Sequence, residues 1–568
     1  MFLSFLSMLL IAIWASFGAN ATPRYPQGIC SHGPDDRACW GKYSLSTNYY
    51  EESPDTGVVR EYWFNVENKT MALDGVERIV LSVNGMVPGP TIIANWGDTV
   101  VVHVTNSLMN NGTSIHFHGL RQFETNQMDG PTSITQCPIA PGDSFTYRWV
   151  ASQYGSSWYH AHFAVQTWDG VYGGIIINGP ATENYDEDKG TIILSDWDHR
   201  TAPVLALEAR QTGPPQMVSG LINGTNVFNG TGSRFKTQFV AGTSYRLRII
   251  NAAADTHFRF TIDDHIMTVI ASDFVPIEPY NTTNINLGEG QRYDVIVHTN
   301  KETSGRFWMR AIAQLTCSNH ANPDNIRGII EYVSHPDERP TCNENCDPTT
   351  TAHPTIDSCD DEDMKKLVPR LSIPASPNVS QFNKQAVSLQ QLPNRLFWTM
   401  NNSSFVAQWD YPTLQQIAER NNTYGTEQNL IRLPKKNEWA YFKITTDFNT
   451  SHPIHFHGHD FWVLAAGHGS YNESIPLQLE NGPRRDVAML PSLGYLIIAI
   501  IVDNPGIWLA HCHIAWHAVE GFAIQLLELE DEMHKIDTVY NKDSIENTCR
   551  NWRSYIDIRN LEQDDSGL

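Results

Sequence analysis

The segment "HCHIAWH" (residues 511–517) places three histidines and one cysteine within seven residues. A soft thiolate and neutral imidazoles form a donor set that suits copper, zinc or iron. In an extended strand, residues i and i+2 point to one face and residue i+1 points to the other. The imidazoles of His511 and His513 should therefore face one space, and the thiol of Cys512 should face another.

Three further segments repeat this alternation of histidines. They are "HFHG" (116–119), "WYHAHF" (158–163) and "HPIHFHGHDF" (452–461). Together the four His-x-His pairs supply eight imidazoles that strand geometry can direct into one cluster. The eight are His116, His118, His160, His162, His455, His457, His511 and His513. His452 and His517 are left over, and with Cys512 they make the His₂Cys ligand set of a blue-copper centre.

Two simpler explanations of these histidines are a satisfied core residue and a structural zinc site. A structural zinc site takes only four ligands, whereas eleven donors are offered here. We therefore interpret the pattern as a multinuclear metal centre. The peptide bonds of segment 511–513 would join its two donor sets, which is an arrangement for electron transfer.

The fold class is indicated by short apolar or alternating runs bounded by Gly, Pro, Asn and Asp. Examples are "TVVVHVTN" (99–106) and "YLIIAIIV" (495–502). Runs of this length predict β-sandwiches or barrels. Helical stretches are expected to be short, as around Leu414–Glu419.

A chain of 568 residues is too long to fold around a single hydrophobic core, and its length predicts about three domains. Two segments lack apolar periodicity, "NGPATENYDEDKG" (178–190) and the Pro-, Asp- and Cys-rich stretch 334–363. We therefore expect β domains at 22–180, at 181–364 including a linker, and at 365–568. A Cys342–Cys346 bond is expected to staple the linker.

The first residues and the charge indicate where the protein works. Residues 1–21 form an apolar run ending in Ala-Asn-Ala, which predicts a secretory signal cut after Ala21, with a membrane anchor as the alternative. The net charge of −23 disfavours binding to nucleic acid or to an anionic membrane.

Sequons and cysteines support the secretory route. Beyond the expected signal, eleven Asn-x-Ser/Thr sequons predict a glycosylated eukaryotic protein: Asn68, Asn111, Asn223, Asn229, Asn281, Asn378, Asn401, Asn402, Asn421, Asn449 and Asn472. Nine cysteines leave eight for disulfides once Cys512 is set aside.

The four histidine motifs resemble the copper-binding motifs of the multicopper oxidases, and most of all those of ascomycete-type fungal laccases. The similarity covers essentially the whole mature chain and includes "SIHFHGLRQ", "DGPTSITQCPIAPG" and "NPGIWLAHCHIAWHAVEGF". It implies three cupredoxin-like Greek-key β-sandwich or barrel domains and four coppers. It also implies a secreted monomer that oxidises phenols or aromatic amines by one electron each and reduces O₂ to water.

The resemblance assigns the metal ligands residue by residue. The type 1 ligands would be His452, Cys512 and His517, and the type 2 ligands His116 and His455. The ligands of the type 3 pair would be His118, His160, His162, His457, His511 and His513. Disulfides would be Cys137–Cys549, Cys30–Cys39 and Cys317–Cys359.

Three further side chains are implied to tune or assist the reaction. Asp255 matches the acid of the substrate pocket, beside the electron-accepting His517, and Asp129 matches an acid that supplies protons near the type 2 copper. The ordinary alternatives are a surface Asp at a turn and an Asp-Gly turn residue. Phe522 occupies the axial position of the type 1 site, where many ascomycete laccases carry Leu.

The C-terminal "DSGL" (565–568) resembles the ascomycete ending that plugs the channel to the trinuclear cluster, with a solvated tail as the alternative. Other functions compete with a general laccase. They are a metal-ion oxidase acting on Fe(II), a dedicated phenol-coupling oxidase of pigment or secondary-metabolite synthesis, and a copper-storage protein. Storage does not require a thiolate beside eight histidines.

Overall fold

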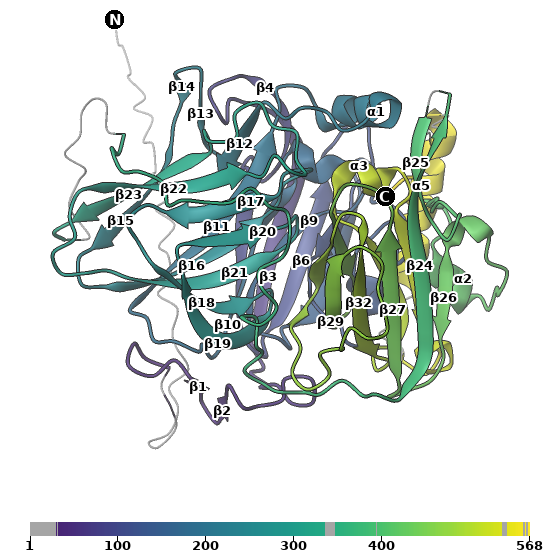
Figure 1. Cartoon of the computed structure of the whole chain (residues 1–568). Coiled ribbons are helices and arrows are strands. Elements are labelled where there is room, and N and C mark those ends of the chain that lie inside the picture. The colour runs from purple at the N-terminus through teal and green to yellow at the C-terminus, as the bar shows by residue number, and fades with distance from the viewer. Residues whose placement is uncertain are drawn as a thin grey trace, which may run out of the picture.

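The computed structural model describes residues 30, 32–335, 347–393, 395–536, 542–559, 563 and 566–568. Strands dominate, and they form three pairs of facing sheets along the chain. In Figure 1 the teal strands of the second pair lie on the left and the green strands of the third lie on the right. The predicted all-β class with three sandwich domains is confirmed.

The first sandwich contains two four-stranded sheets, β4-β3-β6-β8 and β5-β10-β9-β7. Its strands are β3 (Val59–Met71), β4 (Arg78–Val83), β5 (Gly89–Asn95), β6 (Thr99–Asn106), β7 (Ile115–Phe117), β8 (Ser144–Val150), β9 (Gly155–Ala161) and β10 (Tyr172–Asn178). In β8 buried and exposed residues alternate, so Phe145, Tyr147 and Trp149 enter the core. This is the period-2 pattern of a strand with one solvated face.

The second sandwich contains a six-stranded and a five-stranded sheet. Its strands are β11 (Glu187–Trp197), β12 (Ser219–Ile222), β15 (Phe235–Val240), β16 (Ser244–Asn251), β17 (Phe258–Ile262), β18 (Met267–Ser272), β19 (Val275–Thr282), β20 (Asn284–Leu287), β21 (Arg292–His298), β22 (Arg306–Ala313) and β23 (Arg327–Val333). Side chains of both sheets fill one apolar core.

The third sandwich also contains six-stranded and five-stranded sheets. Its strands are β24 (Val379–Leu392), β25 (Arg395–Met400), β26 (Leu430–Leu433), β27 (Trp439–Thr446), β28 (His452–Phe456), β29 (Phe461–His468), β30 (Arg484–Arg485), β31 (Val487–Leu490), β32 (Gly494–Ile501), β33 (Gly506–Cys512) and β34 (Ala523–Glu528). The apolar run 495–502 supplies β32, which is central in its sheet and buried on both faces.

The α-helices are α1 (Ala202–Thr212), α2 (Thr413–Ala418), α3 (Ala515–Val519), α4 (Glu530–Met533) and α5 (Lys542–Arg559). The expectation of short helices is wrong for α5, which has 18 residues. Ile545, Cys549 and Trp552 recur at helical spacing and are buried, so α5 packs through one apolar face. Across the described residues, every helix is too short or too polar to cross a bilayer.

The described residues contain three disulfides, and all three agree with the expected pairing: Cys30–Cys39, Cys137–Cys549 and Cys317–Cys359. The Cys137–Cys549 bond ties a loop of the first sandwich to α5. Cys512 is the free cysteine of the described residues, and it is buried. The expected signal (1–21) and the Cys342–Cys346 bond lie outside the described residues.

Candidate metal centre

The histidine pairs lie at the ends of paired strands in the first and third sandwiches. In β7 and β9, His116 stands opposite His160, and in β28 and β33, His455 stands opposite His511. The second histidine of each pair directly follows the last residue of its strand. Strand pairing therefore brings four histidines together within each of the two sandwiches.

The two groups of four meet in one buried cluster. The donor atoms of three overlapping triples lie within 4.8 Å of one another. These triples are His116–His118–His160, His116–His455–His457 and His162–His457–His511. The eighth ring, that of His513, has its centroid 5.1 Å from that of His118. All eight side chains are buried.

Backbone carbonyls fix the orientation of half of these rings. Four imidazoles donate their Nδ1–H to a carbonyl oxygen at 2.7–2.9 Å, namely His116, His160, His455 and His511. This hydrogen bond leaves a lone pair on Nε2. Within the described residues, the Nε2 atoms of His116, His160 and His455 have no hydrogen-bond partner. Buried acceptors that converge without donors are suited to a cation.

Electrostatics keeps these rings neutral. Burial, followed by the mutual repulsion of neighbouring rings, lowers the pKa of His160, His162, His455, His457 and His513 well below the usual range. Burial lowers the pKa of His511 to about 4. Metals bind the neutral imidazole, so protons hardly compete for this cluster near neutral pH.

A second donor set lies on the other side of β33. The Sγ atom of Cys512 is 3.4 Å from Nδ1 of His517 and 3.9 Å from Nδ1 of His452. The two Nδ1 atoms are 3.2 Å apart. Burial raises the pKa of the Cys512 thiol well above its usual value, so a bound cation is needed to displace its proton. Two imidazoles and one sulfur fit copper.

Phe522 packs beside this second set. It is fully buried, and its ring centroid is 5.1 Å from that of His452. Its N–H donates to the carbonyl of His517 and its own carbonyl accepts from Cys512 N–H. A phenyl ring offers no donor atom to a metal.

Asp255 is buried and contacts the donor set of His452, Cys512 and His517 indirectly, through Trp516. Its Oδ2 accepts a hydrogen bond from Nε1 of Trp516 at 3.2 Å, and Trp516 precedes His517. Burial raises the pKa of Asp255 well above its usual range, and the nearby Glu289 and Asp196 raise it further. The alternative of an ordinary surface Asp does not match this environment.

Asp129 lies directly against the eight-histidine cluster. Its Oδ2 accepts from Nδ1 of His457 at 2.8 Å, and its backbone carbonyl accepts from Nδ1 of His116 at 2.7 Å. The carboxylate is fully buried. Asp129 thus bridges one histidine of the first sandwich and one of the third.

Asp486 is a further cluster residue that sequence analysis did not single out. Its carbonyl accepts from His455 at 2.8 Å, its Oδ1 is 3.1 Å from Nε2 of His118, and its carboxylate pairs with both terminal nitrogens of Arg292 at 2.5 and 2.6 Å. Burial raises the pKa of Asp486 to about 7, although Arg292 opposes the rise. The available signal was a charged "RRD" (484–486) beside the apolar β31.

The end of the chain lies beside α3 (Figure 1). Ser566 N–H donates to the carbonyl of Val519, and Trp409 Nε1 donates to the carbonyl of Gly567 at 2.8 Å. Leu568 is buried in an apolar cluster that includes Phe163, the residue after His162. The described residues 566–568 are therefore packed, and the alternative of a solvated tail does not describe them.

Comparison with known proteins agrees with this architecture. Three family models, each described as multicopper oxidase, match residues 65–182, 188–335 and 385–532. The chain is 46% identical to oxidoreductase OpS5 of Beauveria bassiana (95% of this chain, 93% of that protein). It is 45% identical to laccase-1 of Botryotinia fuckeliana (95% and 94%).

A solved structure gives the same result in three dimensions. The crystal structure of a laccase from Botrytis aclada superposes with a TM-score of 0.89 at 43% identity, covering 95% of this chain and all of that one. The three sandwiches are thus cupredoxin-like domains. With three matching family models and buried donor sets that fit copper, the chain belongs to the multicopper oxidase family and is a laccase-like oxidoreductase.

Proposed function

We propose that this enzyme oxidises phenols and aromatic amines one electron at a time and reduces dioxygen to water. The observation that carries the proposal is the alternation along β33. The Sγ of Cys512 faces His452 and His517, whereas the imidazoles of its two neighbours face the eight-histidine cluster. A site for single electrons is thus separated by only a few covalent bonds from a site large enough for several metals.

Four coppers are proposed, in the arrangement that the family resemblance implies. The type 1 ligands would be His452, Cys512 and His517, the type 2 ligands His116 and His455, and the type 3 ligands His118, His160, His162, His457, His511 and His513. Copper in these sets would supply one-electron transfer at the thiolate and oxygen reduction at the cluster.

The carboxylates of the chain would handle protons. A phenol, with a pKa near 10, is hard to oxidise while it holds its proton. Asp255 would accept that proton as a general base, and its hydrogen bond to the residue that precedes His517 supports this role. Asp129 would deliver protons to the cluster, and its hydrogen bond to His457 supports that role.

We further propose a secreted, glycosylated monomer with a cleaved signal (1–21) and domains at 22–180, 181–364 and 365–568. The apolar start, the eleven sequons and the disulfides support this route. We expect small phenols or aromatic amines and O₂ as partners, and binding to neither nucleic acid nor membranes.

A donor panel tests the proposed substrate class. Oxygen uptake by the purified enzyme is measured with several phenols, including a dimethoxyphenol, with aromatic amines and with Fe(II), all at matched concentrations. A laccase consumes one O₂ per four phenols and prefers the organic donors. A clear preference for Fe(II) would indicate a metal-ion oxidase, and activity on one phenol only would indicate a dedicated coupling enzyme.

Replacing the thiol of Cys512 tests the observation on which the proposed function rests. Cys512→Ser should abolish the intense blue colour and donor oxidation, because a serine hydroxyl keeps its proton and lacks the soft sulfur. The far-ultraviolet circular dichroism should match that of the wild type. A folded Cys512→Ser protein that remains blue would overturn the assignment of the second donor set.

A further inference from the structure

A buried histidine outside the metal centre has no explained partner. His257 lies in the second sandwich, directly before β17, and is fully buried. Within the described residues, neither its Nδ1 nor its Nε2 has a hydrogen-bond partner. A buried polar ring without partners costs folding free energy, and such a group calls for a specific explanation.

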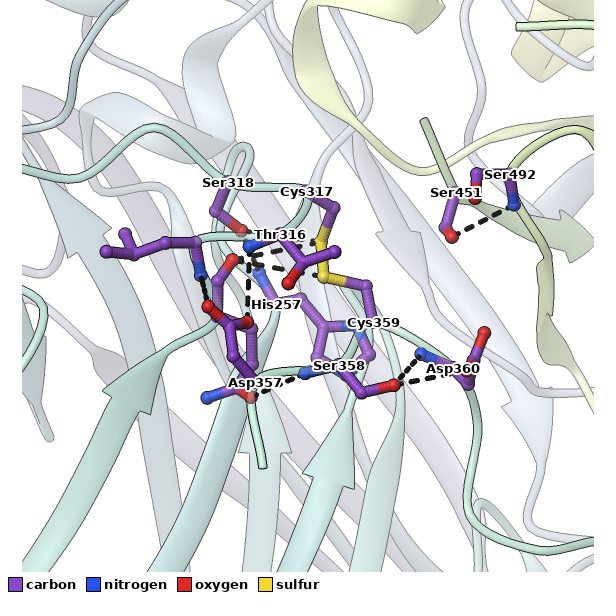
Figure 2. The surroundings of a disulfide bond; sticks show 12 residues. His257, Thr316, Cys317, Ser318, Asp357, Ser358, Cys359, Asp360, Ser451 and Ser492 are labelled. Carbon is purple, nitrogen blue, oxygen red and sulfur yellow. Dashed lines mark hydrogen bonds between the residues drawn. A yellow bond between two sulfur atoms is a disulfide. The ribbon is translucent and has the colours of Figure 1, made fainter. Parts of the chain in front are cut away.

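The Cys317–Cys359 disulfide lies next to this ring. A ring nitrogen of His257 and the two Sγ atoms lie within 4.8 Å of one another (Figure 2). β17 pairs with β22, and the N–H of Gln314 donates to the carbonyl of His257 at 2.9 Å, so the chain that leads to Cys317 starts beside the histidine. Cys359 lies in the segment that connects the second and third sandwiches.

This connecting segment is held in place independently of the disulfide. The carboxylate of Asp357 accepts from the N–H groups of Leu315 and Thr316, both at 3.1 Å. Ser358 N–H donates to the side-chain oxygen of Gln314 at 3.1 Å. These bonds flank both cysteines (Figure 2). Opening the S–S bond would therefore leave the two sulfurs close to each other and to His257.

We propose that the Cys317–Cys359 bond and His257 form a redox-convertible site, which binds one Cu(I) ion when the bond is reduced. A dithiol donates two electrons and two protons, the S–S bond breaks into two thiols, and the dithiol closes into its own disulfide. Binding of Cu(I) then releases the two thiol protons to water. The site is separate from the oxidase reaction and does not depend on it.

The donor set selects the ion. Two thiolates and one imidazole are soft to intermediate donors, which favour Cu(I) over hard cations. A structural zinc site takes four ligands from Cys, His, Asp or Glu. The further polar groups beside these sulfurs are the carbonyl oxygen of Gln314, at 3.8 and 4.0 Å from them, and the hydroxyl of Ser318, at 3.7 Å from Cys317 Sγ. Neither is a usual zinc ligand. Burial lowers the pKa of His257 to about 3, so the ring is neutral and able to coordinate.

The site can be reached from one side. Cys317 is half-buried and the adjacent Leu315 is exposed, whereas Cys359 and His257 are buried. A small dithiol or a Cu(I) complex can approach Cys317 from solvent. In either state the connecting segment stays fastened to the second sandwich, by a covalent bond or by a shared ion.

The test uses the copper-loaded enzyme under anaerobic conditions. The protein is treated with a dithiol, the reductant is removed, and opened bonds are mapped by alkylation and mass spectrometry. Copper(I) is then offered as a coloured bicinchoninate complex, whose fading measures transfer to the protein. The treated wild type should take up one more copper per chain than the untreated enzyme.

Variants separate the proposed ligands from general effects. His257→Leu should bind the additional ion at least tenfold more weakly, and the double variant Cys317→Ser/Cys359→Ser should not bind it. His320→Leu is the matched control, because His320 is also buried in the second sandwich but both its nitrogens are hydrogen-bonded, to Ser219 and Asn322. It should behave as the wild type.

Two results would overturn the proposal. One is equal Cu(I) affinity in His257→Leu and the wild type. The other is a Cys317–Cys359 bond that stays closed at a dithiol concentration that opens Cys30–Cys39. If His257→Leu does not fold, the difference X-ray absorption spectrum of the wild type decides: a shell of two sulfurs and one nitrogen supports the site, and a shell of sulfur alone contradicts it.

Discussion

At the scale of single residues, Asp255 is proposed to accept the proton of a phenol as the phenol gives up an electron. Asp255→Asn should slow phenol oxidation about 10²-fold, the lower range for a general base. The carboxylate form accepts the proton, and burial raises its pKa well above the usual value. Wild-type phenol oxidation should therefore fall as the pH drops through this raised pKa.

The measurement is a pH profile of kcat/KM with a phenol and with a donor that has no ionisable proton. The Asn variant should lose the acid limb of the phenol profile and keep its rate with the second donor. Equal losses with both donors would show that Asp255 only supports Trp516, with which it shares a hydrogen bond.

Phe522 is proposed to influence the reduction potential of the His452–Cys512–His517 site. Phe522→Met should lower the potential of the blue centre, because a thioether sulfur at the axial position stabilises Cu(II). A redox titration followed at the blue absorption band measures this. Phe442→Met, in the same apolar core, is the matched control and should leave the potential unchanged. A constant or higher potential in Phe522→Met would refute the axial role.

The sequence predicted which histidines and which cysteine lie together better than it predicted the residues that hydrogen-bond to them. The His-x-His spacing carries its own geometry, because a strand alternates its faces. Asp486 was missed, because its role depends on Arg292, which lies 194 residues away in the second sandwich. A local sequence pattern cannot identify a hydrogen-bond partner that comes close only when the chain folds.

At the scale of elements, the last residues of the chain contact α3. Deleting 565–568, or adding residues after Leu568, should change turnover or copper retention and leave the blue absorption largely intact. The reason is that Ser566 binds the carbonyls of Ala518 and Val519, and that its own carbonyl accepts from Ala407.

Steady-state kinetics, copper content and melting temperature of these variants give the answer. Ser566→Ala keeps the length of the tail and loses only the two hydrogen bonds of the hydroxyl, which donates to the Ala518 carbonyl and accepts from the Leu568 N–H, so it should show a smaller effect. A deletion without any change in these three quantities would make the tail irrelevant to the enzyme.

Helices and strands could be predicted from the sequence where a single hydrophobic pattern dominates the segment. The unbroken apolar run 495–502 predicts a buried strand, and its residues 495–501 lie in β32. The helix α5 was missed although Ile545, Cys549 and Trp552 have helical spacing, because polar residues outnumber them and the β pattern prevails elsewhere. The buried face of α5 is evident only in the folded chain, where Cys549 forms a disulfide with Cys137 of the first sandwich.

At the scale of the whole molecule, the Cys137–Cys549 bond joins the first sandwich to the last helix. It closes a loop of 412 residues, which chain-entropy arguments value at roughly 6 kcal/mol. Cys137→Ser/Cys549→Ser should lower the melting temperature. A chelator should also remove copper from the eight-histidine cluster faster than from the site of Cys512, because only the cluster lies between two sandwiches.

Calorimetry and the time course of copper loss, followed by electron paramagnetic resonance and the blue band, measure these effects. The matched control is Cys30→Ser/Cys39→Ser, whose bond spans only 9 residues and should matter less. Equal effects of both variants, or equal loss of copper from both sites, would contradict this role of the bond.

The assembly of the cluster from both ends of the chain has a consequence for protein synthesis. Asp129 and His457 are hydrogen-bonded in the folded enzyme but stand 328 residues apart in the sequence. A nascent chain therefore holds half of the oxygen-reducing pocket for most of its translation, and it acquires the thiolate only near the end. A prematurely terminated product that ends before His455 would carry four imidazoles without their counterparts, so it could not form the eight-histidine cluster.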